Sequence, residues 1–94
     1  MAGNQDFQTQ LEALTELEKY LQRLESEMQE MMRLYWNELT VLHSRGLPRQ
    51  VFEKFLGEYC PESDSHVKQS CAVIEQAIPY VRLRMQLVEQ ALNG

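Results

Sequence analysis

No glycine or proline occurs between Thr9 and Ser44, and so long an uninterrupted stretch does not suit a fold built from short strands and turns. Most of its residues are strong helix formers. Apolar side chains recur at steps of three and four, the spacing that places them along one side of a helix. The pattern predicts a helix over about residues 6–44, with two overlapping apolar series: Phe7, Leu11, Leu14, Leu17, Leu21, Leu24, Met28 and Met31, then Met28, Met32, Tyr35, Leu39 and Leu42.

Gly46 and Pro48 mark a tight turn after this helix. Glycine accepts the left-handed backbone that ends many helices, and proline suits the first turn of the next helix. A short helix is therefore predicted over about residues 48–59. Phe52 and Phe55 share one of its faces, and we expect that face to pack back against the first helix.

A proline directly after Cys60 predicts a break between the short helix and a final one, because proline disfavours helical geometry in the residue before it. The final helix is predicted over about residues 61–92, where apolar residues alternate at steps of four and three. Pro79 lies inside this pattern and predicts a kink, since it cannot donate to the carbonyl four residues earlier. The seam consists of Val67, Cys71, Ile74, Ile78, Val81, Met85, Val88 and Leu92.

Charge and composition narrow the classes of partner. Nine basic and fourteen acidic residues give a net charge of −5, which disfavours nucleic acid as a partner. No apolar run reaches the roughly 18–20 residues of a membrane span, so no membrane partner is expected. The 94 residues form one domain, residues 1–94. With two cysteines and no leader-like segment, the expected compartment is the cytoplasm, with export by a leaderless specialised secretion route as an alternative.

Motifs that carry catalysis are missing from the sequence, including phosphate loops, dinucleotide fingerprints and nucleophile elbows. Cys60, His66 and Cys71, with His43 added, could be drawn as a zinc site, but their spacing matches no Cys-x2-Cys knuckle. A buried cysteine is more often a small apolar side chain than a ligand. We therefore expect no enzyme, no catalytic residue, no metal ligand and no cofactor, and keep a small metal-binding or enzymatic bundle as a remote alternative.

Methionines cluster in the first helix, and more apolar residues lie outside the predicted seams than one contact between two helices covers. Methionine can repack against varied partner helices, and it equally fills irregular cores. Uncovered apolar surface favours self-association or a partner. The candidate interaction residues are Met28, Met31, Met32, Tyr35, Trp36, Phe52, Phe55, Ile78 and Met85.

An aromatic segment, Tyr35-Trp36-Asn37-Glu38, precedes the Phe52-x-x-Phe55 pair and the heptad helix from Val67 to Leu92. In this order these features resemble the Trp-x-Gly family of small helical-hairpin proteins. The resemblance implies two antiparallel helices, assembly into homo- or heterodimeric four-helix bundles, and a link to specialised secretion or toxin delivery. The chain departs from the family pattern at Glu38, which stands where the motif has glycine, and Trp36 precedes Gly46 by ten residues.

Together these patterns predict an all-α fold, an elongated antiparallel helical hairpin of coiled-coil type with a short extra helix at the turn. We expect a homodimer in which two hairpins form a four-helix bundle, because one hairpin of this size buries little apolar area. The expected function is that of a non-enzymatic protein–protein interaction module, an adaptor, chaperone or secretion-associated hairpin that binds a larger helical partner. The alternative is a self-associating structural coiled-coil subunit.

Overall fold

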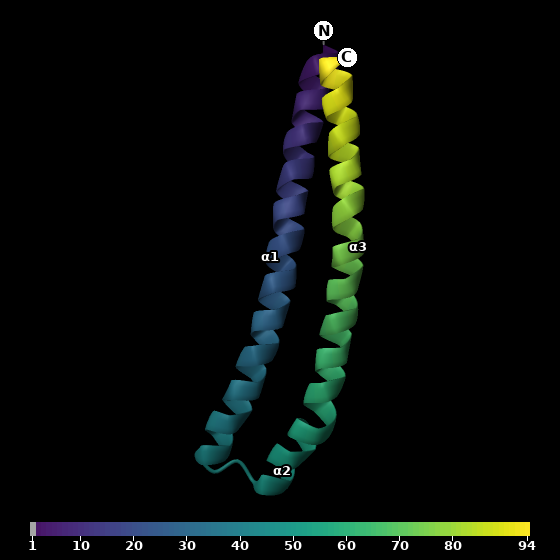
Figure 1. The fold of residues 1–94 in the computed structure, drawn as a ribbon. Helices are drawn as coiled ribbons and strands as arrows, with labels where there is room; N and C mark the ends of the chain where they lie inside the picture. The colour runs from purple at the N-terminus through teal and green to yellow at the C-terminus, as the bar shows by residue number, and fades with distance from the viewer. Residues whose placement is uncertain (1) are drawn as a thin grey trace. The chain divides into compact units, whose positions relative to one another are not determined.

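The computed structural model describes residues 2–94, and Figure 1 shows its helices in chain order. They are α1 (Ala2–Ser44), the short helix α2 (Arg49–Lys54), a π-helical segment η1 (Phe55–Tyr59) and α3 (Cys60–Asn93). No β-strand occurs among the described residues. The predicted all-α class is confirmed. None of the helices within residues 2–94 is long and apolar enough to cross a membrane.

Helix α1 begins at Ala2, upstream of the start that we predicted at residue 6. No proline lies between these two positions, and the single glycine there, Gly3, costs only about 1 kcal/mol in a helix. No residue between position 6 and Ala2 therefore prevents the helix from extending to Ala2.

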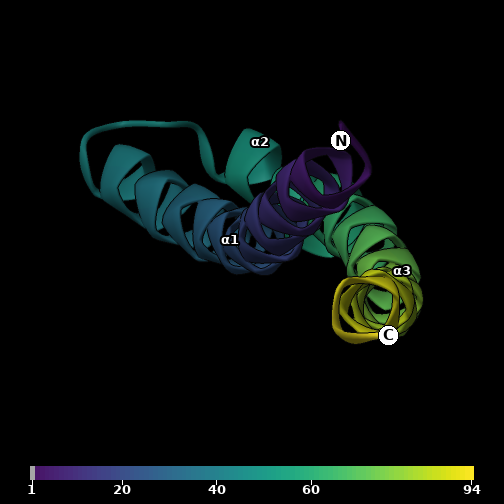
Figure 2. The ribbon, with the colours of Figure 1, turned by 90° about the horizontal axis from the view of Figure 1, so that it is seen from above.

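The end of α1 is closed by hydrogen bonds that use Gly46. The N–H of Leu47 donates to the carbonyl of Leu42 (2.9 Å), and the N–H of Gly46 donates to the carbonyl of His43 (3.3 Å). This is the Schellman arrangement, and it needs the positive φ of Gly46, which is 117°. The chain then reverses direction through residues 45–48, the loop visible before α2 in Figures 1 and 2.

The break that we predicted at Cys60–Pro61 is wrong. The backbone at Phe55 and at Cys60 is right-handed helical, and the helix runs without interruption from α2 through η1 into α3. The N–H of Cys60 donates to the carbonyl of Phe55, five residues earlier, which is the π-helical pattern. Pro61 lacks an N–H and its ring would collide with the carbonyl four residues earlier. The wide turn directly before it relieves that conflict, so the chain stays helical.

The same widened turn changes which side chains face inward. From Phe52 onward one series of sheltered positions steps by four, through Leu56 and Cys60 to Asp64, and Phe55 and Ser63 are half-buried beside it. An α-helix repeats every 3.6 residues, so a run of fours would drift around its surface. The π-helical turn contains one extra residue, which cancels this drift. The helix face that carries Phe52 therefore continues into the seam of α3. Pro79, by contrast, lies inside α3 without interrupting it.

The chain divides into two compact units. The terminal unit comprises the residues up to Leu24 together with Ala72–Gly94, and the turn unit comprises Glu25–Cys71. Segments of α1 and α3 lie alongside each other within each unit (Figure 1). In the terminal unit Glu18 pairs with Arg82 across the two helices.

The two segments run antiparallel in both units. Leu14 and Val88 line one hollow of the terminal unit, so lower numbers on α1 face higher numbers on α3. In the turn unit Cys71 Sγ lies 4.0 Å from the carbonyl oxygen of Glu25. Each unit has a thin row of buried side chains: Ile74, Val81 and Val88 in the terminal unit, and Met32, Leu39, Cys60 and Cys71 in the turn unit.

Candidate functional site

A groove lined largely by methionine lies in the turn unit and is the candidate binding site. Its α1 wall contains three methionines and Tyr35, and its α3 wall contains Ser63 and Val67. The cavity volume is about 390 Å³. We call it the methionine groove, defined by Met28, Met31, Met32, Tyr35, Ser63 and Val67.

Neighbouring methionines take opposite roles in this groove. Met32 is buried, with 8% of its side chain accessible, whereas Met31 is 67% exposed. Consecutive helix residues point about 100° apart, so one side chain packs inward and the next extends to the rim. Met28 is half-buried and lies one turn away from both. The groove therefore combines a packed floor with a rim side chain that is exposed to solvent.

Tyr35 closes the groove toward the turn and connects it to the buried Cys60. Burial raises the pKa of Tyr35 above its usual value, and the hydrogen bond and the electrostatic interaction with Cys60 raise that pKa further. The phenol therefore stays neutral over the physiological range. Cys60 has no accessible surface at all, and neither cysteine forms a disulfide bond.

Exposed ion pairs on α1 flank the methionines. Arg33 Nε donates to Glu30 Oε2 (2.9 Å), and the second guanidinium nitrogen bonds the other carboxylate oxygen. The hydrogen bond with Arg33 lowers the pKa of Glu30, and the same bond raises the pKa of Arg33. Both groups are solvent-exposed, so the pair adds little stability and acts as a charged border to the apolar groove.

The other aromatic candidates surround the turn. Trp36 is half-buried on α1 beside Tyr35. Phe52 stacks on His43, with ring centroids 4.2 Å apart and planes at 10°, so this face of α2 packs on the last turn of α1. Phe55 contacts Tyr59 edge-to-face at 4.9 Å. These contacts anchor the turn, and none of the three candidates Trp36, Phe52 and Phe55 lines the methionine groove.

Two further candidates belong to the other unit. Ile78 and Met85 are half-buried on the side of α3 that carries the buried Ile74 and Val81. They lie in the terminal unit and are not part of the methionine groove. The sequence could not show that Ile78 and Met85 lie outside the groove, because the heptad pattern is the same in the part of α3 that lines the groove and in the part that does not.

The sequence pattern does not predict the α3 wall of the groove. It places Val67 in the seam of the final helix and indicates no role for Ser63. A usable signal was present, because extending the seam backward from Val67 by seven residues reaches Cys60, which is fully buried. The predicted break at Pro61 hid this continuation.

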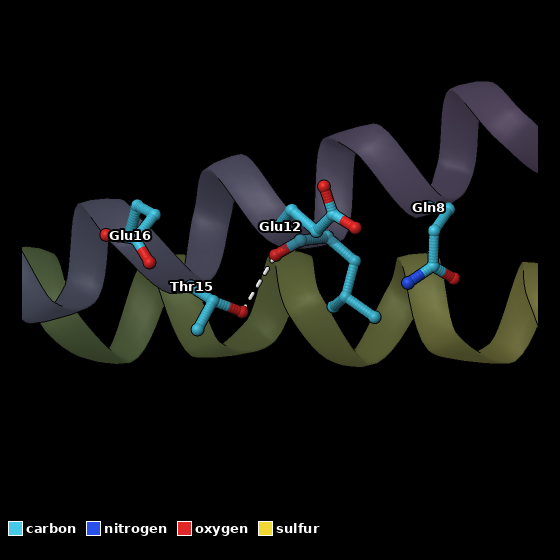
Figure 3. Close-up of a pocket in the computed structure, with 5 residues that line it drawn as sticks. Gln8, Glu12, Thr15 and Glu16 are labelled. Carbon is cyan, nitrogen blue, oxygen red and sulfur yellow. Dashed lines mark hydrogen bonds between the residues drawn. The ribbon is translucent and has the colours of Figure 1, made fainter.

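A second hollow, of about 440 Å³, lies on α1 in the terminal unit (Figure 3). The described residues that line it lie between Gln8 and Glu16 on α1, over about two and a half turns, and Figure 3 shows the labelled side chains projecting from that helix. The hydroxyl of Thr15 donates to the carbonyl of Leu11 (2.8 Å) and is thereby satisfied within the helix. This hollow lacks a second wall, so it offers less to a ligand than the methionine groove.

The cysteines and histidines considered for a metal site are not gathered into one cluster. His66 is exposed and lies 3.9 Å from Glu62, while His43 stacks on Phe52. Within the described part of the chain, no group of three or more histidine, cysteine or acidic side chains is placed to hold a metal ion.

Comparisons with models of protein families, with curated proteins and with solved structures found no match for this chain. The resemblance to the Trp-x-Gly family therefore stays a prediction.

Proposed function

We propose that this chain is a non-enzymatic protein–protein interaction module that holds one helix of a larger partner in the methionine groove. The exposed side chain of Met31, beside the buried Met32, carries this proposal. Unbranched thioether side chains adapt to partner surfaces of different shape, and an amphipathic helix laid in an apolar groove is a common mode of recognition. The proposal covers adaptor, chaperone and secretion-associated roles.

The charge of the turn unit favours a particular kind of helix. Residues 25–71 contain eight carboxylates and five lysine or arginine side chains, so the unit is acidic. Complementary charges speed association and exclude wrong partners. The partner segment we propose is an amphipathic helix whose apolar stripe is flanked by lysine or arginine.

A photo-crosslinking amino acid at position 31 tests the proposal in the cells that make the protein. The matched control is position 34, because Leu34 is also exposed on α1 but does not line the groove. We expect crosslinks from position 31 to a basic amphipathic helix of another protein, and none to that helix from position 34. Equal crosslinking from both positions, or crosslinks only to a second copy of the chain, would contradict the groove as the partner site.

Self-association is the second candidate function, a structural subunit whose partner is itself. The observation that favours it is the set of exposed apolar side chains in the terminal unit, away from the methionine groove. The homodimer predicted from the sequence, with four helices packed together, would bury them. Both functions can coexist, because they use residues of different units.

A further inference from the structure

Helix α3 carries a second row of apolar side chains in the terminal unit. Val73 and Tyr80 are 62% and 64% exposed, and Leu83 and Leu87 are also exposed. The steps between the four are seven, three and four, so they share one side of the helix. We call them the α3 stripe: Val73, Tyr80, Leu83 and Leu87.

The α3 stripe is separate from the row that packs on α1. The buried residues Ile74, Val81 and Val88 are offset from Val73, Tyr80 and Leu87 by one position each. One position corresponds to about 100° around a helix. The terminal unit thus presents two heptad rows on the same helix, one covered by α1 and one in solvent.

The two long sides of the terminal unit differ in character. On one side Arg82 Nε donates to Glu18 Oε1 (2.7 Å), which bridges α1 and α3 with charge. On the other side Leu17 and Arg84 line a hollow of about 320 Å³ together with Ala13 and other residues of both helices. Leu17 is itself exposed. The exposed apolar surface of the terminal unit therefore lies on the side that does not carry the Glu18–Arg82 ion pair.

The chain exposes more surface than a compact monomer of its mass. Its total accessible surface is 7075 Å², whereas a compact monomer of 11.1 kDa exposes on the order of 5,700 Å². The excess of roughly 1,400 Å² belongs to the whole chain, and an interface of standard size would need only part of it, ~800 Å² from each partner.

Charge selects α3 rather than α1 as the surface that a second copy approaches. Residues 72–94 carry Glu75 and Glu89 against Arg82 and Arg84, so this segment is neutral. The facing segment of α1, residues 6–24, has four carboxylates and two basic side chains. Two α3 segments can meet without net repulsion, whereas two acidic α1 segments would repel each other.

We propose that the α3 stripe is the homodimer seam, with two copies of α3 packed antiparallel about a two-fold axis at Tyr80. This inference rests on the proposed self-association and specifies its surface and symmetry. Val73 and Leu87 stand seven residues on either side of Tyr80, so a two-fold axis there places Val73 of one chain against Leu87 of the second copy. Such a pattern is self-complementary, as a closed dimer requires.

The polar neighbours of the stripe fit the same register. With Tyr80 on the axis, Arg84 of one chain lies opposite Gln76 of the second copy, and the reverse holds by symmetry. Both are polar and one is neutral, so no like charges are brought together. A parallel arrangement would instead set Arg84 against Arg84 of the second copy and is disfavoured by repulsion.

The first experiment compares Tyr80→Glu with Gln86→Glu by analytical ultracentrifugation. Both residues are exposed on α3 and both substitutions add one negative charge, but Gln86 lies outside the stripe. We expect wild type and Gln86→Glu to sediment as dimers. Tyr80→Glu should weaken the dimer by at least about 30-fold, because an aromatic anchor is lost and two carboxylates meet on the axis. Circular dichroism should show equal helix content in all three.

The second experiment tests the antiparallel register with single cysteines and a short bismaleimide crosslinker, with wild type as the control for the buried native thiols. Tyr80→Cys should crosslink to itself. Val73→Cys should not, because two such positions are separated by 14 residues, about 21 Å along the helix. A mixture of Val73→Cys and Leu87→Cys chains should crosslink to each other.

The possible failures are distinguishable. A monomer for wild type at every concentration would overturn both the self-association and the seam. A dimer that survives Tyr80→Glu as well as Gln86→Glu would leave self-association standing and overturn the α3 stripe as its surface. Crosslinking of Val73→Cys to itself would overturn the antiparallel register in favour of a parallel one.

Discussion

At the scale of single residues, the groove depends on the angle between adjacent side chains rather than on their chemistry. Met31 and Met32 are identical in composition, yet one is 67% exposed and the other 8%. The buried thioether fills the space between α1 and α3, and its removal would leave a cavity. The exposed one contacts solvent, and in the proposed function it contributes to binding rather than to folding.

We expect Met32→Ala to lower the free energy of unfolding by about 2–5 kcal/mol, because it removes buried atoms and leaves a cavity. Met31→Ala should change it by no more than about 0.5 kcal/mol, as is usual for an exposed position. Urea denaturation followed by circular dichroism measures both. Equal losses for the two variants would mean that Met31 is covered in solution, which is the result expected only if a partner or second copy packs there.

The sequence predicted part of this site. The helical spacing of Met28, Met32 and Tyr35 was enough to place them on a common face of α1. The heptad places Val67 in the seam of α3, but the spacing within one helix does not say which residues of another helix lie opposite, so only the packing of α3 against α1 places Val67 and Ser63 across from these residues.

At the scale of elements, the π-helical segment η1 joins two helical stretches that a proline would otherwise separate. It ends at Tyr59, two residues before Pro61, and contains Gly57, whose backbone is not in the left-handed region. Gly46, in the turn, has φ of 117°. The two glycines therefore serve opposite purposes, one inside a helix and one at its end.

Alanine substitutions at Gly57 and Gly46 should change the free energy of unfolding in opposite directions. Gly57→Ala should raise the free energy of unfolding by about 0.5–1 kcal/mol, because alanine favours helix and a Cβ at this position meets no atom within 4 Å. Gly46→Ala should lower it by about 1 kcal/mol, since an L side chain is strained at that φ. Thermal unfolding of the two variants checks the prediction, and a loss of stability for Gly57→Ala would show that η1 requires glycine.

Element types were more predictable than element junctions. The long glycine-free stretch and the heptad of α3 predicted two helices. The rule that proline disfavours helix in the preceding residue predicted a break at Cys60, where the backbone is helical. Packing of Phe52 against His43 and burial of Cys60 hold the chain in one continuous helix, and the wide turn lowers the local cost.

At the scale of the whole molecule the core is thin, because among the buried side chains that the structure describes only that of Cys60 has no accessible surface. A core this thin provides a narrow margin over the conformational entropy lost on folding. Burial of the α3 stripe in a dimer would add to that margin, and stability would then depend on protein concentration.

We therefore expect the midpoint of thermal unfolding to rise by roughly 5–10 °C when the concentration of wild-type protein is raised 100-fold. Tyr80→Glu should show no such rise, while Gln86→Glu should behave as wild type. Differential scanning calorimetry over this range of concentrations makes the measurement. A wild-type midpoint that stays constant would mean that folding is complete in the monomer.

Local sequence determined the helices, their apolar rows and the glycine turn, because backbone propensity and a 3.6-residue repeat act within a few residues of each position. The tertiary structure decided which rows are covered. Ile74 and Val73 are neighbours in one apolar segment, but only Ile74 is buried, because α1 covers one side of α3 and leaves the other in solvent. The heptad of α3 already marks Ile74 as a seam residue, but which helix covers that seam depends on contacts between residues more than forty positions apart, such as Glu18 with Arg82.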